Sequence, residues 1–243
     1  MKIAIIGLFC MGLFCSLESA AQKKAAPHAV SLDNLSEFEP TTSNWKLVKS
    51  VSFSPTTDEK SFEPGTGIVL ALPVKPDTGH LFTKMQHGDI ELEFDFAVAS
   101  KSNSGVYLQG RYEAQIFDSW GVKKPDFYDC GGIYQRWDEG RTPKKGFEGT
   151  PPAQNACKAA GEWQHFRIVF QAPRFDRNGK KTVNAKFLKV ELNGVLVHEN
   201  IEVTGPTRSA AFEDERASGP LMFQGDHGPV ALRNIRYTLL KEM

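Results

Sequence analysis

The sequence predicts an all-β protein, and three observations support this fold class. Apolar and polar residues alternate over several short stretches, which is the pattern of strands with one buried face. No long stretch shows the periodicity of a capped amphipathic helix. The 21 glycines and 14 prolines punctuate the chain at the short intervals expected of turns between strands. These features are typical of a β-sandwich or barrel.

The chain has the size and composition of one globular domain. Its 243 residues fall within the range of a single all-β domain, and its 17 phenylalanines can fill a large core. The 29 basic residues equal the 29 acidic ones, so the formal net charge is zero. Because nucleic acid and anionic lipid are bound by basic surfaces, neither partner is expected.

The N-terminus has the pattern of a signal peptide. An apolar run that ends at Leu17 is followed by small residues at Ser19 and Ala21, which suits cleavage before Gln22. The run is shorter than the ~20 residues that span a bilayer, and no later segment is apolar enough to act as a transmembrane segment. We therefore predict a signal peptide over residues 1–21 and an exported protein, periplasmic or extracellular.

A lipid anchor is the alternative, because Cys10 and Cys15 lie in the leader region. Each follows a bulky phenylalanine where lipoprotein processing requires a small residue, so the unanchored form is favoured. Residues 22–30 show no periodic pattern and are expected to form a disordered leader. The folded domain is expected over residues 31–243.

Strand signals are dense in the remaining chain. Polar and apolar residues alternate over residues 89–98, 165–170 and 188–192. In the first segment, the apolar residues expected to share a buried face are Ile90, Leu92, Phe94 and Phe96. The pair Asn193–Gly194 between two such segments predicts a hairpin, because both central residues of a type I′ turn need positive φ.

Two long loops are expected over residues 119–160 and 204–219, and long loops in compact domains tend to be functional. Cys130 and Cys157 lie in the first loop and are the two cysteines that remain after cleavage. An even number of cysteines in an exported protein favours a disulfide between them. Two buried free thiols are the alternative, since spacing alone does not show that the Cβ atoms meet.

Residues 103–121 carry the pattern most relevant to function. Read with a period of two, one face is apolar: Val106, Leu108, Tyr112, Ala114 and Ile116. The other face is a row of hydrogen-bonding groups: Tyr107, Gln109, Arg111, Glu113 and Gln115. Sugar hydroxyls need such donors and acceptors, so the row predicts a carbohydrate partner on one concave surface. An ordinary solvated face is the alternative, but such faces favour lysine, which this row lacks.

Eight motifs stand in order along the chain: Asn103–Tyr107, Tyr112–Ile116, Cys130–Tyr134, Gly161–Gln164, Ala172–Asp176, Asn193–Val195, Gln224–Gly228 and Arg233–Ile235. In this order they resemble the bacterial 3-keto-disaccharide hydrolase domain over roughly residues 35–240. The resemblance implies a concanavalin A-like jelly-roll sandwich. It also implies the activities of a 3-keto-glucoside 1,2-lyase and a 3-keto-2-hydroxy-glucal hydratase.

The implied chemistry needs a base rather than two carboxylates flanking the glycosidic bond. A ketone at C3 acidifies the C2 proton and places the C1 oxygen β to the carbonyl. Elimination then requires a base at C2, an electrophile for the enolate oxygen and an acid at the leaving oxygen. We assign Glu113 as the base, Arg111 as the oxyanion partner that keeps it ionised, and His227 as an acid or metal ligand.

The other residues that we expect to bind substrate are Tyr107, Gln109, Gln115, Trp120, Tyr134, Gln224 and Asp226. Trp120 and Tyr134 are candidate stacking rings, with loop packing as the alternative. A divalent metal held by Glu113, Asp118 or Asp226 would polarise the ketone and is kept as an alternative. The six histidines show no close spacing, so a structural zinc site is not expected.

Two other functions fit the sequence. Residues 113–118 have the spacing of the Glu-x-Asp-x-x-Glu run of jelly-roll endoglucanases, which suggests a retaining glycosidase. However, Gln115 and Asp118 replace two of its carboxylates, and Asp118 has the wrong parity to face Glu113. A non-catalytic carbohydrate-binding module would need aromatic platforms but no charged pair. Arg111 and Glu113 therefore favour an enzyme, unless they form only a surface ion pair worth about 0–1 kcal/mol.

Overall fold

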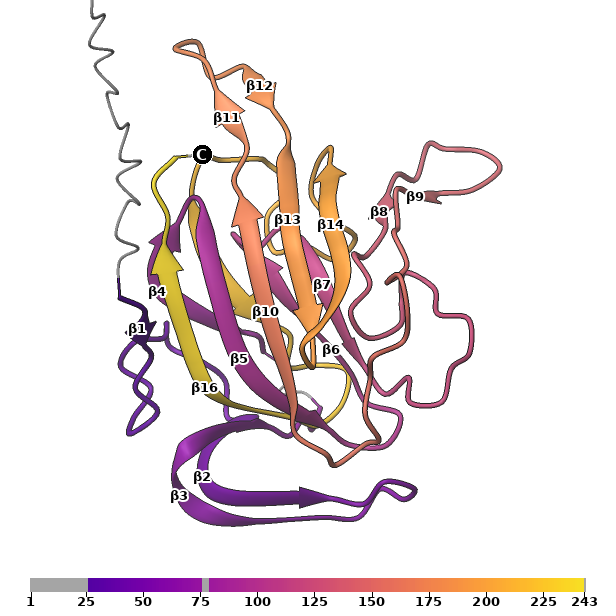
Figure 1. Cartoon of the computed structure of the whole chain (residues 1–243). Helices are drawn as coiled ribbons and strands as arrows, with labels where there is room; N and C mark the ends of the chain where they lie inside the picture. The colour runs from indigo at the N-terminus through magenta and orange to yellow at the C-terminus, as the bar shows by residue number, and fades with distance from the viewer. Residues whose placement is uncertain (1–25, 76–78, 243) are drawn as a thin grey trace, which may run out of the picture.

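The computed structural model describes residues 26–75 and 79–242, in which two antiparallel sheets pack face to face (Figure 1). The larger, eight-stranded sheet has the order β14 (Val195–Val203), β13 (Ala185–Leu192), β10 (Gln164–Gln171), β5 (Ile90–Val98), β16 (Val230–Leu239), β3 (Lys60–Ala71) and β2 (Trp45–Phe53), with β1 (His28–Ala29) paired to β16. The four-stranded sheet has the order β4 (Leu81–His87), β15 (Gly219–Phe223), β6 (Asn103–Leu108) and β7 (Tyr112–Phe117). The predicted all-β, jelly-roll type of sandwich is confirmed.

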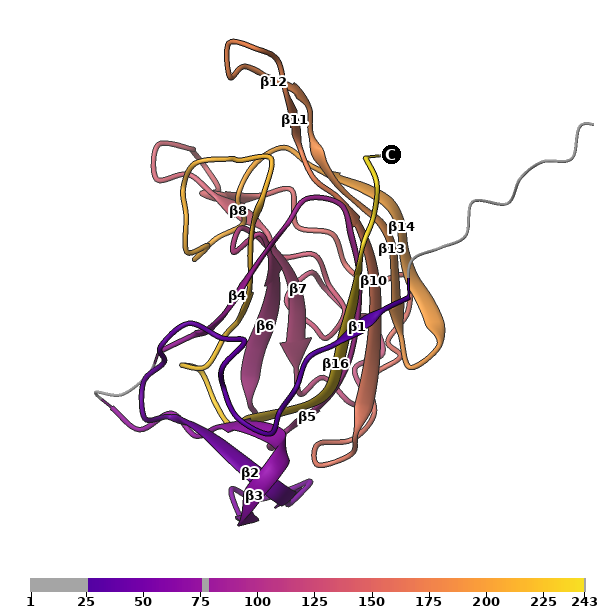
Figure 2. The same cartoon turned by 90° about the vertical axis from the view of Figure 1, so that its left-hand side faces the viewer.

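Two short hairpins extend from the sandwich. One is formed by β11 (Arg174–Phe175) and β12 (Lys181–Val183), and the other by β8 (Arg136–Trp137) and β9 (Gly146–Phe147). Figure 2 shows the sandwich edge-on as two layers, with β6 and β7 in one and β16, β10 and β13 in the other. The described residues include no helix long and apolar enough to cross a membrane.

The core lies between the two sheets and is built by the predicted alternation. Ile90, Leu92, Phe94 and Phe96 of β5 are fully buried. Phe94 meets Phe223 of the smaller sheet edge-on, with ring centroids 5.4 Å apart. Burying a phenylalanine side chain stabilises the fold by about 1.5–3 kcal/mol, so these aromatic contacts join the two sheets.

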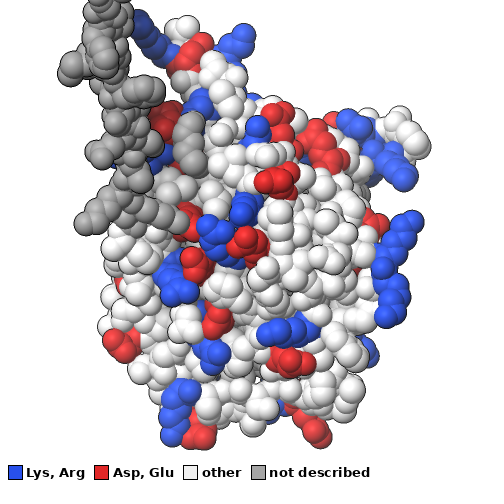
Figure 3. All heavy atoms as spheres, viewed as in Figure 1, with Lys and Arg blue, Asp and Glu red and all other residues white. Residues whose placement is uncertain are grey.

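The outer face of the larger sheet carries charges that pair with one another. Arg167 lies between Glu91 and Glu191, with nitrogen–oxygen distances of 2.7 and 2.9 Å. Nδ1 of His165 on β10 lies 2.8 Å from Oδ1 of Asp95, which is opposite it on β5. Figure 3 shows blue and red side chains interspersed over this face. This face is therefore a solvated surface with its own ion pairs.

The predicted hairpin turn is confirmed. Asn193 and Gly194 have φ of 54° and 79°, and they join Leu192 of β13 to its partner Val195 of β14. Asparagine and glycine adopt these left-handed conformations at low cost, which explains the strong local signal.

The prediction for the N-terminal segment needs a correction. His28–Ala29 forms β1 and pairs with Tyr237 and Arg236, so the predicted disordered leader over residues 22–30 does not extend that far. Val30 is buried, and its N–H donates to the carbonyl of Ile235 at 2.9 Å. The strand is held by tertiary pairing with β16, which no local pattern reveals. The predicted signal peptide lies outside the described residues.

The two long loops lie along the smaller sheet. Residues 131–134 run antiparallel to β7, where the Gly131 N–H donates to the Gln115 carbonyl at 2.9 Å and the Tyr134 N–H to the Glu113 carbonyl at 3.1 Å. In the second loop, the Thr207 N–H donates to the Arg111 carbonyl at 2.9 Å. Both loops thus cover the free edge of β7.

Cys130 and Cys157 are both free thiols in the structure. Cys130 is fully buried, Cys157 is half-buried, and their side chains form a hydrogen bond. This contact lowers the pKa of Cys157 to about 7, while burial raises the pKa of Cys130. The two sulfurs are therefore neighbours, and the disulfide itself stays a prediction.

Candidate active site

The smaller sheet has a polar face that points away from the core. The apolar residues of the predicted pattern, Val106, Leu108, Tyr112, Ala114 and Ile116, are fully buried on its core side. Three members of the predicted polar row, Tyr107, Glu113 and Gln115, share the opposite face. We call this surface, together with Gly105 and Gln224, the polar face. Its side chains are only 1–7% exposed, because the two long loops lie along it.

Strand register places these residues close together. Tyr107 of β6 is opposite Glu113 of β7, and Gly105 is opposite Gln115. On the other side of β6, the N–H of Gln224 donates to the Gly105 carbonyl at 2.9 Å. The absence of a side chain at Gly105 is required here, because a Cβ atom would lie 2.2 Å from Oε1 of Glu113. The carboxyl group of Glu113 therefore lies over Gly105.

Burial changes the protonation of Glu113. Desolvation raises the pKa of Glu113 to about 8. This effect outweighs the hydrogen bond from Tyr107, which lowers the pKa. The negative charge of Asp226 raises it further. The prediction that Arg111 keeps Glu113 ionised at neutral pH is wrong, because at pH 7 most of the population is protonated.

Arg111 interacts with the 204–218 loop instead of with Glu113. Its guanidinium group donates to Oδ1 of Asp214 at 2.6 Å and to the carbonyl of Gln109 at 2.8 Å, and it stacks on Phe212. The side chain is only 5% exposed. Arg111 therefore holds a loop in place, and the structure does not support its predicted role as the oxyanion partner.

Gln109 also serves the local fold. It occupies the β6–β7 turn with φ of 55°, next to Gly110 with φ of 66°. Its side-chain nitrogen donates to the carbonyls of His87 and Ala217, both at 3.1 Å. The alternation that placed Gln109 and Arg111 in the polar row holds for strands, but both residues lie at the turn.

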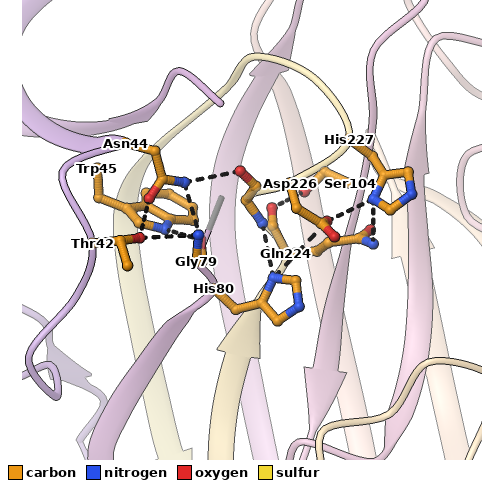
Figure 4. Close-up of polar contacts among 10 residues, drawn as sticks. Thr42, Asn44, Trp45, Gly79, His80, Ser104, Gln224, Asp226 and His227 are labelled. Atoms are coloured by element: carbon orange, nitrogen blue, oxygen red, sulfur yellow. Dashed lines mark hydrogen bonds and ion pairs between the residues drawn. The ribbon is translucent and has the colours of Figure 1, made fainter. Parts of the chain in front are cut away.

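A cluster of titratable groups adjoins the polar face (Figure 4). His227 and Asp226 follow β15, and Nδ1 of His227 is 2.6 Å from Oδ1 of Asp226. The same histidine nitrogen is 3.3 Å from Nε2 of Gln224. Nδ1 of His80 is 3.9 Å from Oδ1 of Asp226, and burial lowers the pKa of His80. The predicted residues Gln224, Asp226 and His227 are thus brought together.

His80 and Gly225 are positioned by a second network at the start of β2. The side-chain nitrogen of Asn44 donates to the Gly79 carbonyl at 3.0 Å and to the Gly225 carbonyl at 2.9 Å. Nε1 of Trp45 donates to the same Gly79 carbonyl at 2.8 Å. The backbone on both sides of the His80–Gly225 contact is therefore fixed (Figure 4).

Other predicted residues lie at different places. Tyr134 is half-buried, and its burial raises its pKa. The charge of Glu113 also raises the pKa of Tyr134, which places this tyrosine next to the polar face. Trp120 is 66% exposed in a turn. The Asp118 carboxylate accepts from the Lys101 N–H at 2.9 Å and so stabilises a turn.

No group of three or more His, Cys, Asp or Glu side chains among residues 26–75 and 79–242 is arranged to hold a metal ion. The predicted alternative set of Glu113, Asp118 and Asp226 is therefore not assembled as a metal site in the described part of the chain.

The polar face carries unused hydrogen-bonding capacity. Oε1 of Gln115 and Oε1 of Gln224 are buried and have no hydrogen-bond partner among the described residues. Buried acceptors without partners are costly, at about 1–3 kcal/mol each, and a bound hydroxyl group would satisfy them. Both oxygens belong to residues that flank Gly105, next to the carboxyl group of Glu113.

Sequence reasoning missed His80 and the role of Gly105. His80 stands alone before a strand, and only the paired strands β4 and β15 bring it to Gly225. Gly105 lies within one of the recognised motifs, but its contact with Glu113 depends on cross-strand register.

Solved structures of other proteins are similar to this chain. A candidate glycosyl hydrolase from Parabacteroides distasonis ATCC 8503 has 22% identity and a TM-score of 0.56, with 87% of this chain and 84% of that chain covered. A second such structure from the same organism has 22% identity and a TM-score of 0.48 over 81% and 99% of the two chains. An endo-beta-1,4-glucuronan lyase from Trichoderma reesei has 11% identity and a TM-score of 0.45 over 89% and 96%.

No curated protein matches the chain. The family model of the 3-keto-alpha-glucoside-1,2-lyase-like domain matches residues 32–238, which is nearly the whole region that the structure describes. This match includes every residue of the polar face and of the His80–Asp226–His227 cluster. The chain therefore belongs to the family of 3-keto-alpha-glucoside-1,2-lyase-like domains, a carbohydrate-processing family.

Proposed function

We propose that this protein cleaves 3-keto-glycosides by eliminating the group at C1 and then adding water, with net hydrolysis. The observation that carries the proposal is the buried carboxyl group of Glu113, which lies over Gly105 among acceptors that lack partners. Family membership supports a sugar with a ketone at C3.

The proposed reaction balances without an oxidant or reductant. Glu113 takes the C2 proton, and the electrons of the C2–H bond form an enolate with the C3 ketone. The enolate expels the C1 oxygen, which takes up a proton, and a C1–C2 double bond results. Water then adds its hydroxyl group to C1, and a proton returns to C2. One acid–base group facing C2 can serve both steps.

The raised pKa of Glu113 suits this role. A proton next to a ketone is weakly acidic, and a carboxylate with a pKa of about 8 is a stronger base than an ordinary exposed one. However, only a minor fraction of Glu113 is ionised at pH 7. Turnover should therefore increase as the pH rises toward 8.

The first prediction tests Glu113 directly. Glu113→Gln keeps the size of the side chain but removes its basicity, so turnover of a 3-keto-glucoside should fall by about 10²–10⁴. Exchange of the C2 proton with deuterated water, followed by NMR, should fall in parallel. The exposed Glu199→Gln provides the matched control on the larger sheet. Exchange at the parent rate in Glu113→Gln would show that Glu113 is structural.

The alternative functions are separated by the substrate. Cleavage of a 3-keto-glucoside but not of the parent glucoside supports elimination, whereas cleavage of the parent alone supports a retaining glycosidase. Binding without cleavage of either compound supports a carbohydrate-binding module.

A further inference from the structure

His80 lies on the same side of the smaller sheet as Glu113. Leu81, the next residue, is fully buried in the core. Because side chains alternate along a strand, His80 and Phe82 point to the opposite side, which is the polar face. Phe82 confirms this direction, since its ring centroid is 6.4 Å from that of Phe212 in the loop held by Arg111.

The strand register also indicates the distance between His80 and Glu113. Leu81 pairs with Phe223 and Phe223 with Val106, so His80, Gln224 and Gly105 form the next row across three strands. Neighbouring strands are about 4.8 Å apart, which places the backbones of His80 and Gly105 about 10 Å apart. The Glu113 carboxyl group lies over Gly105. This row therefore has about the length of one sugar ring, with Gln224 between its two ends.

The hydrogen bonds of His80 define which ring nitrogen carries the proton. The backbone N–H of Gly225 donates to Nδ1 of His80 at 3.3 Å. A neutral imidazole whose Nδ1 accepts a hydrogen bond carries its proton on Nε2. Nε2 has no partner among the described residues, and Figure 4 shows it pointing away from the network. His80 thus presents a hydrogen-bond donor.

We propose that His80 donates a hydrogen bond from Nε2 to the C3 ketone oxygen of the substrate and stabilises the enolate, while Glu113 faces C2. This inference rests on the proposed function and names the electrophile that Arg111 was expected to supply. Since C2 and C3 are adjacent ring atoms, one ring lying over Gln224, between Glu113 and His80, can meet both groups. No group is transferred from His80, which acts as a donor only.

The test compares two variants at the same position. His80→Ala removes the donor, and its kcat should fall by about 10²–10³ with a smaller change in KM, because the bond strengthens as the enolate forms. His80→Gln keeps an N–H donor and should retain more activity than His80→Ala. His165→Ala, on the outer face of the larger sheet, is the histidine control. Equal activity of His80→Ala and the parent protein would overturn the proposal.

Two readouts separate this inference from the proposed function. If the parent protein does not act on 3-keto-glucosides, the proposed function fails. If it does act but His80→Ala still exchanges the C2 proton at the parent rate, only the role of His80 fails. A further readout needs no variant: ¹⁵N NMR of histidine-labelled parent protein at pH 7 should show His80 protonated at Nε2. Protonation at Nδ1 alone would contradict the proposal.

Discussion

At the scale of single residues, burial decides the chemistry of Glu113. The carboxyl group lies over Gly105 on the buried polar face, where desolvation outweighs the hydrogen bond from Tyr107. An exposed carboxylate in the same row would be ionised at neutral pH and would be a weaker base. The alternating pattern indicated which residues share a face, but it contained no information on whether loops cover that face. This is why the residue was predicted and its protonation was not.

The raised pKa of Glu113 also predicts how stability depends on pH. The folded-state pKa, about 8, exceeds the ordinary value of 4.5, so the folded state binds the proton more tightly. The contribution of this proton to the free energy of unfolding is fully present below about pH 4.5 and is lost as the pH rises through 8. The difference is on the order of a few kcal/mol.

Glu113→Gln removes the ionisable carboxyl group and with it this loss of stability at high pH. The variant should therefore raise Tm relative to the parent protein at pH 8 and have little effect at pH 4.5. Thermal unfolding at both pH values measures the difference. An equal change in Tm at the two pH values would show that Glu113 has no raised pKa.

At the scale of elements, the 204–218 loop is held by buried charges. Oε1 of Glu215 accepts from the Tyr112 hydroxyl at 2.8 Å, and Oε2 lies 2.5 Å from Nζ of Lys181. The side chain of Glu215 is only 16% exposed. The loop also touches the candidate site, because Oγ1 of Thr207 accepts from the Glu113 N–H at 3.2 Å.

Glu215→Ala should therefore lower stability by about 2–3 kcal/mol, because it leaves the Tyr112 hydroxyl and the Lys181 ammonium without their partner. Hydrogen exchange of the loop amides should accelerate, and chemical denaturation gives the global loss. Glu213→Ala, an exposed neighbour in the same loop, should change neither. Unchanged protection in Glu215→Ala would show that other contacts hold the loop.

Much of this element structure could be predicted from the sequence, because it depends on local periodicity. The alternation over residues 89–98 gave β5, and Asn193–Gly194 gave the hairpin. The two-residue strand β1 could not be predicted, since only pairing with β16 holds it. The partner of Arg111 could not be predicted either, because Asp214 lies about a hundred positions further along the chain.

At the scale of the whole molecule, the proposed export of the chain bears on the state of its two cysteines. The pattern over residues 1–21 favours export, and the structure brings the thiols of Cys130 and Cys157 into contact. A thiol with a pKa of about 7 is partly ionised at neutral pH, and the thiolate is the form that reacts to make a disulfide.

We therefore predict that the secreted protein begins at Gln22 and carries a Cys130–Cys157 disulfide. Mass spectrometry of the digested, non-reduced protein should show the two cysteine peptides linked. The reduced and alkylated sample is the control. Alkylation of both cysteines in freshly secreted, non-reduced protein would contradict the disulfide, and an intact N-terminus would contradict cleavage.

The paired charges on the outer face of the larger sheet have a consequence for encounter rates. Because Arg167 and Lys189 pair with Glu91 and Glu191 within the sheet, and the whole chain has a net charge of zero, little long-range field extends into solvent. An uncharged sugar gains nothing from such a field. We therefore expect association with the proposed neutral 3-keto-glycoside to be governed by diffusion and orientation, at a rate insensitive to ionic strength.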